Sequence, residues 1–136
     1  MAQGYLLDSN VIIGYLAAKI PIPGMEIVSI IVDQTPNISV ISQIEVLRFN
    51  DTPENEKILV DFVDASVIHH LSPDVVRQTI ELCKKTKIKL PDAIIAATAL
   101  NENLILVTRN IDDFKSISNL EVFNPWDALS ARQTKN

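Results

Sequence analysis

A chain of 136 residues, 47% of them hydrophobic and 21% charged, has the size and balance of one globular domain and not those of a disordered segment. A single cysteine excludes an intramolecular disulfide, and no apolar run is long enough to span a membrane. The net charge of −5 disfavours binding to nucleic acid unless bound cations or a local group of basic residues offset it. We therefore expect a cytoplasmic protein with one domain over residues 1–136, of which about the last six form a flexible tail.

The apolar residues form short aliphatic runs that alternate with helix-like segments, the pattern of a buried parallel sheet flanked by helices. Strands are predicted, in chain order, at residues 5–8, 37–41, 66–69, 104–107 and 121–123. Helices are predicted at residues 11–18, 25–33, 42 onward, 53–62, 73–85 and 92–101. The predicted fold class is α/β, a single domain whose central, mostly parallel sheet has about five strands flanked by helices.

Local signals support several of these boundaries. Prolines and a glycine at 21–24 break the chain before the second helix. The pairs Thr52-Pro53 and Ser72-Pro73 are each typical of an N-cap followed by proline in the first helical turn. On the helix over 73–85 we expect the apolar side chains to face inward, namely Val75, Val76, Ile80 and Leu82, with Cys83 as a small buried residue.

Three acids fall at the predicted strand and helix boundaries. Asp8 ends the first strand, Glu45 lies just past the second, and Asp92 opens a helix. Open parallel sheets build their sites outside the carboxyl ends of the strands, so these distant residues can converge. Carboxylates that share a pocket repel one another unless a hard cation binds, and oxygen ligands without Cys or His favour Mg²⁺ or Mn²⁺.

Each acid also has an ordinary structural explanation. Glu45 stands three residues after Ser42, the spacing of a capping box. Asp92 in a first helical turn interacts favourably with the helix dipole. Asp8 fits such explanations least well, because a carboxylate at the end of a buried strand needs hydrogen-bond partners or a metal.

Four sequence blocks and the end of the domain carry a resemblance to a known family. In order, they are LLDSNVII at 6–13, ISQIEV at 41–46, LPDAIIAATA at 90–99, LVTRN at 106–110 with Asp113-Phe114, and VFNPW at 122–126. Together they resemble the PIN-domain family, specifically toxins of the VapC type. The resemblance covers nearly the whole chain, and its strength lies in the order of the blocks.

The resemblance implies a PIN-like domain with an acidic pocket that binds Mg²⁺ or Mn²⁺ and cleaves single-stranded or looped RNA. In-line attack by a metal-activated water would leave 5′-phosphate and 3′-hydroxyl ends. The catalytic and metal-binding acids implied by matching position are Asp8, Glu45 and Asp92. The implied supporting residues are Thr108, which assists, and Ser9 and Asn10, which orient the first acid.

The fourth acid of the family falls on Asn110 here. Its amide oxygen can coordinate a cation but brings no charge, so a second metal is expected to bind more weakly. Asp112 or Asp113 can supply the missing charge from the next turn, and the Asp113-Phe114 pair belongs to the matched pattern. As first-turn acids behind Asn110 as the N-cap, both aspartates also have a purely structural interpretation.

Partners follow from the resemblance and from the basic residues. The implied partners are an RNA substrate, a small VapB-like antitoxin that places Arg or Lys among the acids, and a second copy of the chain. The homodimer is expected to form through the helices after Pro21 and Pro53, with Ile20, Ile22, Met25 and Ile58 as either contact or core residues. Candidate RNA-binding residues are Arg109, Lys84, Lys85 and Lys87. The basic run that also includes Arg77 and Lys89 has the alternative explanation of a solvated helix end.

The sequence disfavours two other chemistries and leaves two other functions open. A haloacid-dehalogenase-like phosphatase needs an acid two residues after the first one, where this chain has Asn10. Metal-free chemistry needs paired histidines, but His69 and His70 are neighbours in a strand and point to opposite faces. A PIN domain that only binds RNA or protein, and a housekeeping PIN nuclease without antitoxin, are the main alternatives.

Overall fold

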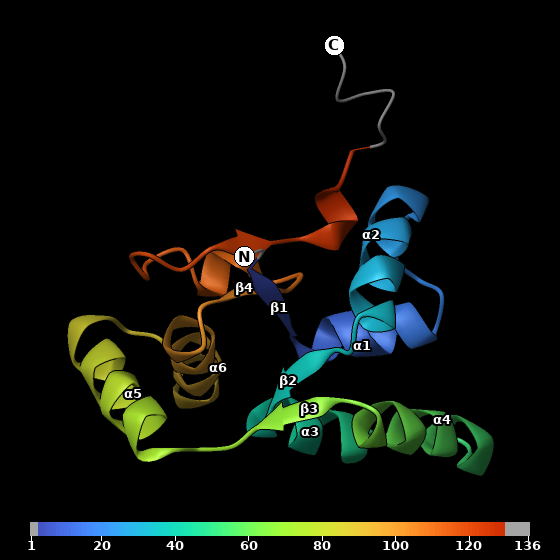
Figure 1. The fold of residues 1–136 in the computed structure, drawn as a ribbon, viewed down its shortest axis with the longest axis horizontal. Helices are drawn as coiled ribbons and strands as arrows, with labels where there is room; N and C mark the ends of the chain where they lie inside the picture. Colours follow the sequence, from blue (N-terminus) through green and yellow to red (C-terminus); the bar gives the residue numbers. More distant parts are fainter. Residues whose placement is uncertain (1–2, 130–136) are drawn as a thin grey trace.

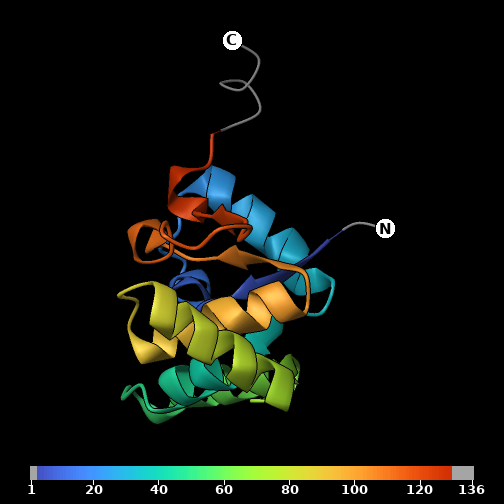
Figure 2. The same ribbon diagram turned by 90° about the vertical axis from the view of Figure 1, so that its left-hand side faces the viewer.

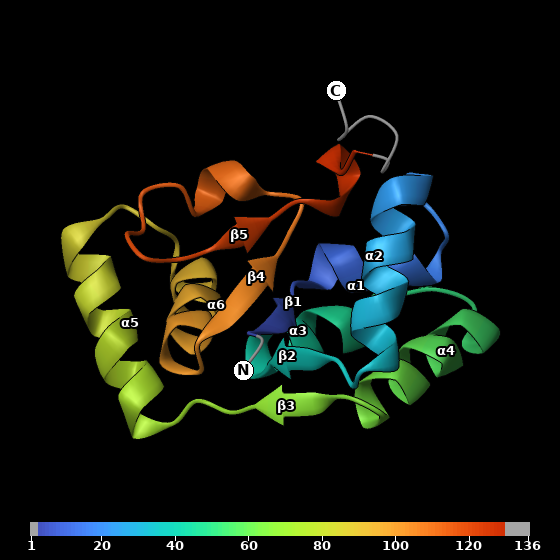
Figure 3. The ribbon, with the colours of Figure 1, turned by 45° about the horizontal axis from the view of Figure 1, so that its top comes forward.

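The computed structural model of the protein describes residues 3–129, and the predicted C-terminal tail lies outside them. Its strands are β1 (Gly4–Leu7), β2 (Asn37–Ser39), β3 (Val67–His69), β4 (Leu104–Val107) and β5 (Val122–Phe123). They form one sheet in the order β3-β2-β1-β4-β5, and every neighbouring pair is parallel (Figure 3). The predicted α/β fold class is confirmed.

Helices cover both faces of the sheet. They are α1 (Ser9–Leu16), α2 (Ile22–Asp33), α3 (Val40–Leu47), α4 (Pro53–Asp64), α5 (Pro73–Lys85), α6 (Leu90–Asn101) and the short 3₁₀ helices η1 (Ile111–Asp113) and η2 (Pro125–Asp127). In Figure 1, α5 and α6 lie on one side of the strands, and α1, α2 and α4 lie on the other. Figure 2 shows α5 and α6 packed side by side. Within residues 3–129, no helix is both long enough and apolar enough to cross a bilayer.

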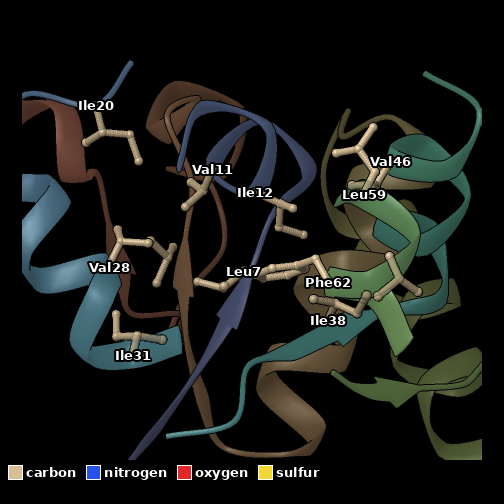
Figure 4. Packing of buried hydrophobic residues seen from close by; sticks show 12 residues of the cluster. Leu7, Val11, Ile12, Ile20, Val28, Ile31, Ile38, Val46, Leu59 and Phe62 are labelled. Carbon is tan, nitrogen blue, oxygen red and sulfur yellow. The ribbon is translucent and has the colours of Figure 1, made fainter. Parts of the chain in front are cut away.

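Two cores form because successive strand residues point to opposite faces of the sheet. Leu6 and Leu106 face α5 and α6, whereas Leu7 and Val107 face the helices of the other layer. Figure 4 shows Leu7 among side chains from α1, α2, β2 and α4. The central strands β1 and β4 therefore contribute to both cores.

Helix starts follow local chemistry, and some of them correct the predictions. Thr52 and Ser72 are N-caps as predicted, and each hydroxyl accepts a hydrogen bond from a backbone N–H of the first turn. Helix α2 begins at Ile22 and not at residue 25, because Pro23 lies in the first turn, where no N–H is needed. The proline cluster therefore opens this helix and does not precede it.

The predicted capping box at Ser42 is wrong. Strand β2 ends at Ser39, and α3 begins at Val40, with Ser39 as its N-cap. The Ser39 hydroxyl accepts a hydrogen bond from the backbone N–H of Ser42 at 3.1 Å. Glu45 is consequently in the interior of the helix, where capping does not explain its presence.

The inward face of α5 is narrower than predicted. Val75, Thr79 and Leu82 are buried at the spacing of one helical stripe. Val76 and Ile80 are 38% and 49% exposed, and Cys83 is exposed as well, which corrects the expectation that all three face inward. The stripe is narrow because, among the helices of residues 3–129, α6 alone packs extensively against α5.

The segment at η2 packs closely against two glycines. A Cβ atom on Gly14 would lie 2.7 Å from the ring of Trp126, and one on Gly24 would overlap the backbone carbonyl of Pro125. Neither glycine has a positive φ, so close approach is the reason for glycine here. These contacts hold the C-terminal part of the domain against α1 and α2.

We predict that Gly24→Ala destabilises the fold by about 1–3 kcal/mol, because the added methyl group forces the backbone of η2 away from α2. The sign of the change in unfolding free energy is informative, because in an isolated helix alanine is more favourable than glycine by about 1 kcal/mol. Urea denaturation measures the effect. Gly4→Ala is the control, because its Cβ would meet side-chain atoms and no backbone: a terminal methyl group of Leu104, which can rotate away, and Asn37 Nδ2 at an ordinary contact distance of 3.7 Å. Equal stability of Gly24→Ala and the parent would contradict the prediction.

Candidate active site

The candidate site lies where β1 and β4 end. Leu7 and Val107 are partners in the parallel ladder, and the next residues along each strand are Asp8 and Thr108. The backbone N–H of Asp8 continues the ladder by donating to the Val107 carbonyl at 3.0 Å. Asp8 is also the N-cap of α1, so its carboxylate is fixed at the junction of strand and helix.

The Asp8 carboxylate is buried and accepts three hydrogen bonds. Its Oδ1 accepts from the backbone N–H of Ser9 at 2.8 Å, and its Oδ2 accepts from Thr108 Oγ1 at 2.8 Å and Asn10 Nδ2 at 3.3 Å. Only 5% of the residue is exposed. Burial raises the pKa of Asp8, and nearby Glu45 and Asp92 raise it further against the lowering effect of the Thr108 and Ser9 hydrogen bonds.

Asn10 is held in the orientation that Asp8 needs. Its Oδ1 accepts from the backbone N–H of Arg109 at 3.0 Å, so its amide nitrogen faces Asp8 and Thr108. The carbonyl of Arg109 in turn accepts from Asn124 Nδ2 at 3.3 Å. Asn124 was not identified from the sequence as a site residue. Its place in the matched block at 122–126 was the signal that could have identified it.

Glu45 reaches the site from α3, which packs against α1. The hydroxyl of Ser9 donates to Glu45 Oε1 at 3.1 Å, while its backbone N–H donates to Asp8. Ser9 therefore connects the two carboxylates. The structure brings Asp8 and Glu45 to the same end of the sheet.

Asp92 lies in the first turn of α6 and is half-buried. Burial raises its pKa most, followed by the negative charges of Asp113 and Glu45, while Lys89 opposes them. Of the candidates for the fourth position, Asp113 is thus the one whose charge raises the pKa of Asp92. Asn110 is exposed and occupies the predicted N-cap position of η1, but its side chain makes no capping hydrogen bond there.

The donors present fit a hard divalent cation in type and charge. The acids Asp8, Glu45, Asp92 and Asp113 all offer oxygen ligands. The pKa values of Asp8 and Asp92 are raised first by burial and further by neighbouring carboxylates, so a bound cation would offset an unfavourable negative charge. In the described part of the chain, however, no three Asp, Glu, His or Cys side chains are close enough to hold a metal ion among themselves. Because Mg²⁺ keeps several of its waters and takes one or two carboxylates, the residues fit a hydrated ion better than an enclosed one.

The basic candidates are separated in space. Lys84 and Lys85 are in the last turn of α5, and Lys85 lines a cleft with Glu81 and residues 116–119. Lys87 lines a different cleft, which contains Asp92. The guanidinium of Arg109 lies over the ring of Trp126, 4.8 Å from its centre. Lys87 thus lines a cleft together with the proposed catalytic acid Asp92.

The histidines show no paired arrangement. His69 Nε2 lies 3.0 Å from Asn37 Oδ1, a contact between β3 and β2, and His70 is exposed. Both placements agree with the expected structural or surface roles.

Comparison with known proteins identifies similar chains. The profile of the PIN domain matches residues 5–120. A chain in the crystal structure of VapBC2 from Rickettsia felis, bound to a DNA fragment from their promoter, is 26% identical with a TM-score of 0.73, covering 88% of this chain and 97% of its own. A chain of a toxin–antitoxin complex from Klebsiella pneumoniae is 29% identical with a TM-score of 0.71, covering 90% and 98%. No curated protein sequence matches significantly.

Proposed function

Because the chain belongs to the PIN-domain family, we propose that it is a Mg²⁺- or Mn²⁺-dependent endoribonuclease and the toxin of a VapBC-like pair. The observation that carries the proposal is the buried carboxylate of Asp8, oriented by three hydrogen bonds beside Glu45 and Asp92. A buried acid kept near other acids costs stability, and a cation-dependent reaction on a phosphodiester gives that arrangement a use.

In this proposal, Asp8 and Asp92 are the main ligands and Glu45 orients the attacking water and accepts its proton. A divalent cation, when bound, supplies charge neutralisation at the phosphate and lowers the pKa of water. Thr108 and Asn10 hold the Asp8 carboxylate in place through their hydrogen bonds. Asp113 adds negative charge beside Asp92, while Asn110 offers an uncharged oxygen.

Product ends and cation dependence test the reaction. We expect cleavage of a single-stranded RNA to leave 5′-phosphate and 3′-hydroxyl ends, to stop in EDTA and to return when Mg²⁺ or Mn²⁺ is added in excess. Mass spectrometry identifies the ends. Activity that persists in EDTA, or 2′,3′-cyclic phosphate products, would rule out the proposed mechanism.

Thr108→Val is predicted to weaken Mg²⁺ binding by about 10–100-fold, because the carboxylate of Asp8 loses the hydroxyl that orients it. Isothermal titration with Mg²⁺ measures the effect without RNA. The control is Thr98→Val, since the hydroxyl of that buried threonine bonds only to the carbonyl of Ile94 within its own helix. A loss of affinity equal in both variants would assign the effect to general destabilisation.

The partner proposal rests on the VapBC and toxin–antitoxin complexes among the similar structures. We propose a VapB-like antitoxin as inhibitor and a homodimer of this chain through α2 and α4. Ile22 and Ile58 are 74% and 47% exposed on those helices and suit a contact surface, whereas Ile20 is buried in the core and Met25 is half-buried. Copurification with the product of a neighbouring small gene, and light scattering of the purified protein, test the two partners separately.

A second candidate function is a PIN domain that binds RNA or protein without cleaving it. Asn110 at the fourth position and the lack of three converging metal ligands among residues 3–129 favour it. It is distinguished by RNA binding without cleavage across Mg²⁺ and Mn²⁺ concentrations.

A further inference from the structure

Three lysines line a cleft beside the proposed catalytic acids. The cleft has a volume of about 330 Å³, and Lys87 and Lys89 reach it from the connection between α5 and α6. Lys115 reaches it from the segment after η1. The carboxylates in the same cleft are those of Asp92, Asp112 and Asp113. Positive and negative side chains therefore meet at the edge of the acidic site.

These lysines are not engaged in ion pairs with the neighbouring carboxylates. Between residues 3 and 129 the salt bridges are those of Lys57 with Asp61 on α4 and of Arg77 with Asp74 on α5, both exposed. Lys87, Lys89 and Lys115 are themselves exposed. Their ammonium groups are thus available to an anionic ligand that enters the cleft.

The other basic candidates have local explanations. Lys84 and Lys85 stand in the last turn of α5, where cations favour the helix dipole. Arg109 stacks on Trp126 and lines another cleft, in which its charge faces Asp112, Asp113 and Asp127. In the cleft at Asp92, by contrast, three lysines balance three aspartates, and a bound cation would leave a net positive lining.

We propose that Lys87, Lys89 and Lys115 bind the phosphodiester backbone of the RNA and guide the strand into the acidic site along the α5–α6 connection. This inference rests on the proposed function and assigns its substrate path. Phosphate is the anion that an RNA strand presents repeatedly, and contacts to it are independent of base sequence. The local lysines also explain how a chain with a net charge of −5 binds a polyanion.

The test compares two triple variants with the same charge change. The first is Lys87→Gln with Lys89→Gln and Lys115→Gln. The control is Lys19→Gln with Arg48→Gln and Lys57→Gln, three exposed positions outside the cleft. The probe is a fluorescein-labelled single-stranded RNA of about 20 nucleotides and mixed sequence, followed by anisotropy over a range of KCl concentrations with Mg²⁺ present. Electrophoresis of the same samples reports cleavage.

For the cleft variant we expect the slope of log K against log salt to lose about 2, at about 0.7 for each phosphate contact on a single strand. This corresponds to about a 10–100-fold loss of affinity near 0.1 M salt. KM for cleavage rises by a similar factor and kcat changes little, because the acids are untouched. The control variant retains the parent's slope.

The outcomes separate the inference from the proposed function. If the parent binds RNA without cutting it, the proposed hydrolysis fails, but the two binding slopes still decide the role of the lysines. Equal slopes in the cleft variant and the parent, or a larger loss in the control, would overturn the inference. An unchanged RNA affinity together with lost antitoxin binding would assign the lysines to the protein partner and would also overturn it.

Discussion

Asp8→Asn is expected to reduce RNA hydrolysis by at least about 10³-fold while shifting the melting temperature by less than about 3 °C. The loss corresponds to about 4 kcal/mol of transition-state stabilisation, the scale expected when a principal ligand of a catalytic cation is removed. Stability is preserved because the amide has the shape of the carboxylate and keeps the acceptor for the Ser9 N–H. The substitution also removes a buried charge whose pKa is raised by its surroundings.

The matched control is Asp64→Asn, which makes the same chemical change at an exposed position at the end of α4. Initial rates on labelled RNA at saturating Mg²⁺, with thermal melts of the same preparations, measure both effects. Equal activity of Asp8→Asn and the parent would remove this carboxylate, and with it the proposed site, from the reaction. Unfolding of the variant would show instead that Asp8 mainly supports the structure.

The fold was predictable where sequence signals are local. The caps at Thr52 and Ser72 depend on one hydroxyl and the proline after it, and the aliphatic run at 104–107 has the same bounds as β4. The start of α3 was misplaced because two serines, three residues apart, both suit a cap. Ser39 is the N-cap because β2 ends at this residue. The length of β2 depends on its pairing with β3, which is distant in sequence.

Burial was predicted less well because it depends on which neighbours an element has. The pattern of α5 allows a broad apolar face, but the single extensive contact with α6 leaves Ile80 and Cys83 exposed. The same limit applies to Ile20 and Ile22. They differ by two positions in sequence, yet one lies in the core and the other is among the most exposed apolar side chains.

The candidate site was predictable in outline, since Asp8, Glu45 and Asp92 stand at element boundaries that a parallel sheet brings together. Asp113 was one of the candidates for the fourth position, but the sequence did not distinguish it from Asn110 and Asp112. Its effect on Asp92 depends on the turn at η1, and the position of Lys89 depends on the path of the α5–α6 connection. Both depend on the three-dimensional course of a loop, which no local sequence pattern specifies.

Mg²⁺ is expected to stabilise the protein near pH 7 much more than near pH 4. The pKa values of Asp8 and Asp92 are raised above the ordinary value of 3.8, so the folded protein binds these protons more tightly than the unfolded chain. Without a cation, the stability linked to the two groups is fully present below the unfolded pKa and is lost as pH rises through the folded values. At neutral pH, a cation that binds the ionised carboxylates restores this stability. At acid pH, protons already occupy the carboxylates, so the cation adds little.

At a Mg²⁺ concentration about tenfold above Kd, the stabilisation is about 1.4 kcal/mol, which shifts the melting temperature of a domain of this size by about 3–5 °C. Melts with Mg²⁺ and with EDTA at both pH values measure the difference, with Asp8→Asn as the comparison that lacks one of the two titrating groups. Exposed acids such as Asp51, whose pKa is lowered by hydrogen bonds to Thr52 and Asn55, change stability in the opposite direction with pH in both proteins and therefore cancel. A Mg²⁺ shift of the same size at both pH values, or in both proteins, would mean that the ion binds elsewhere.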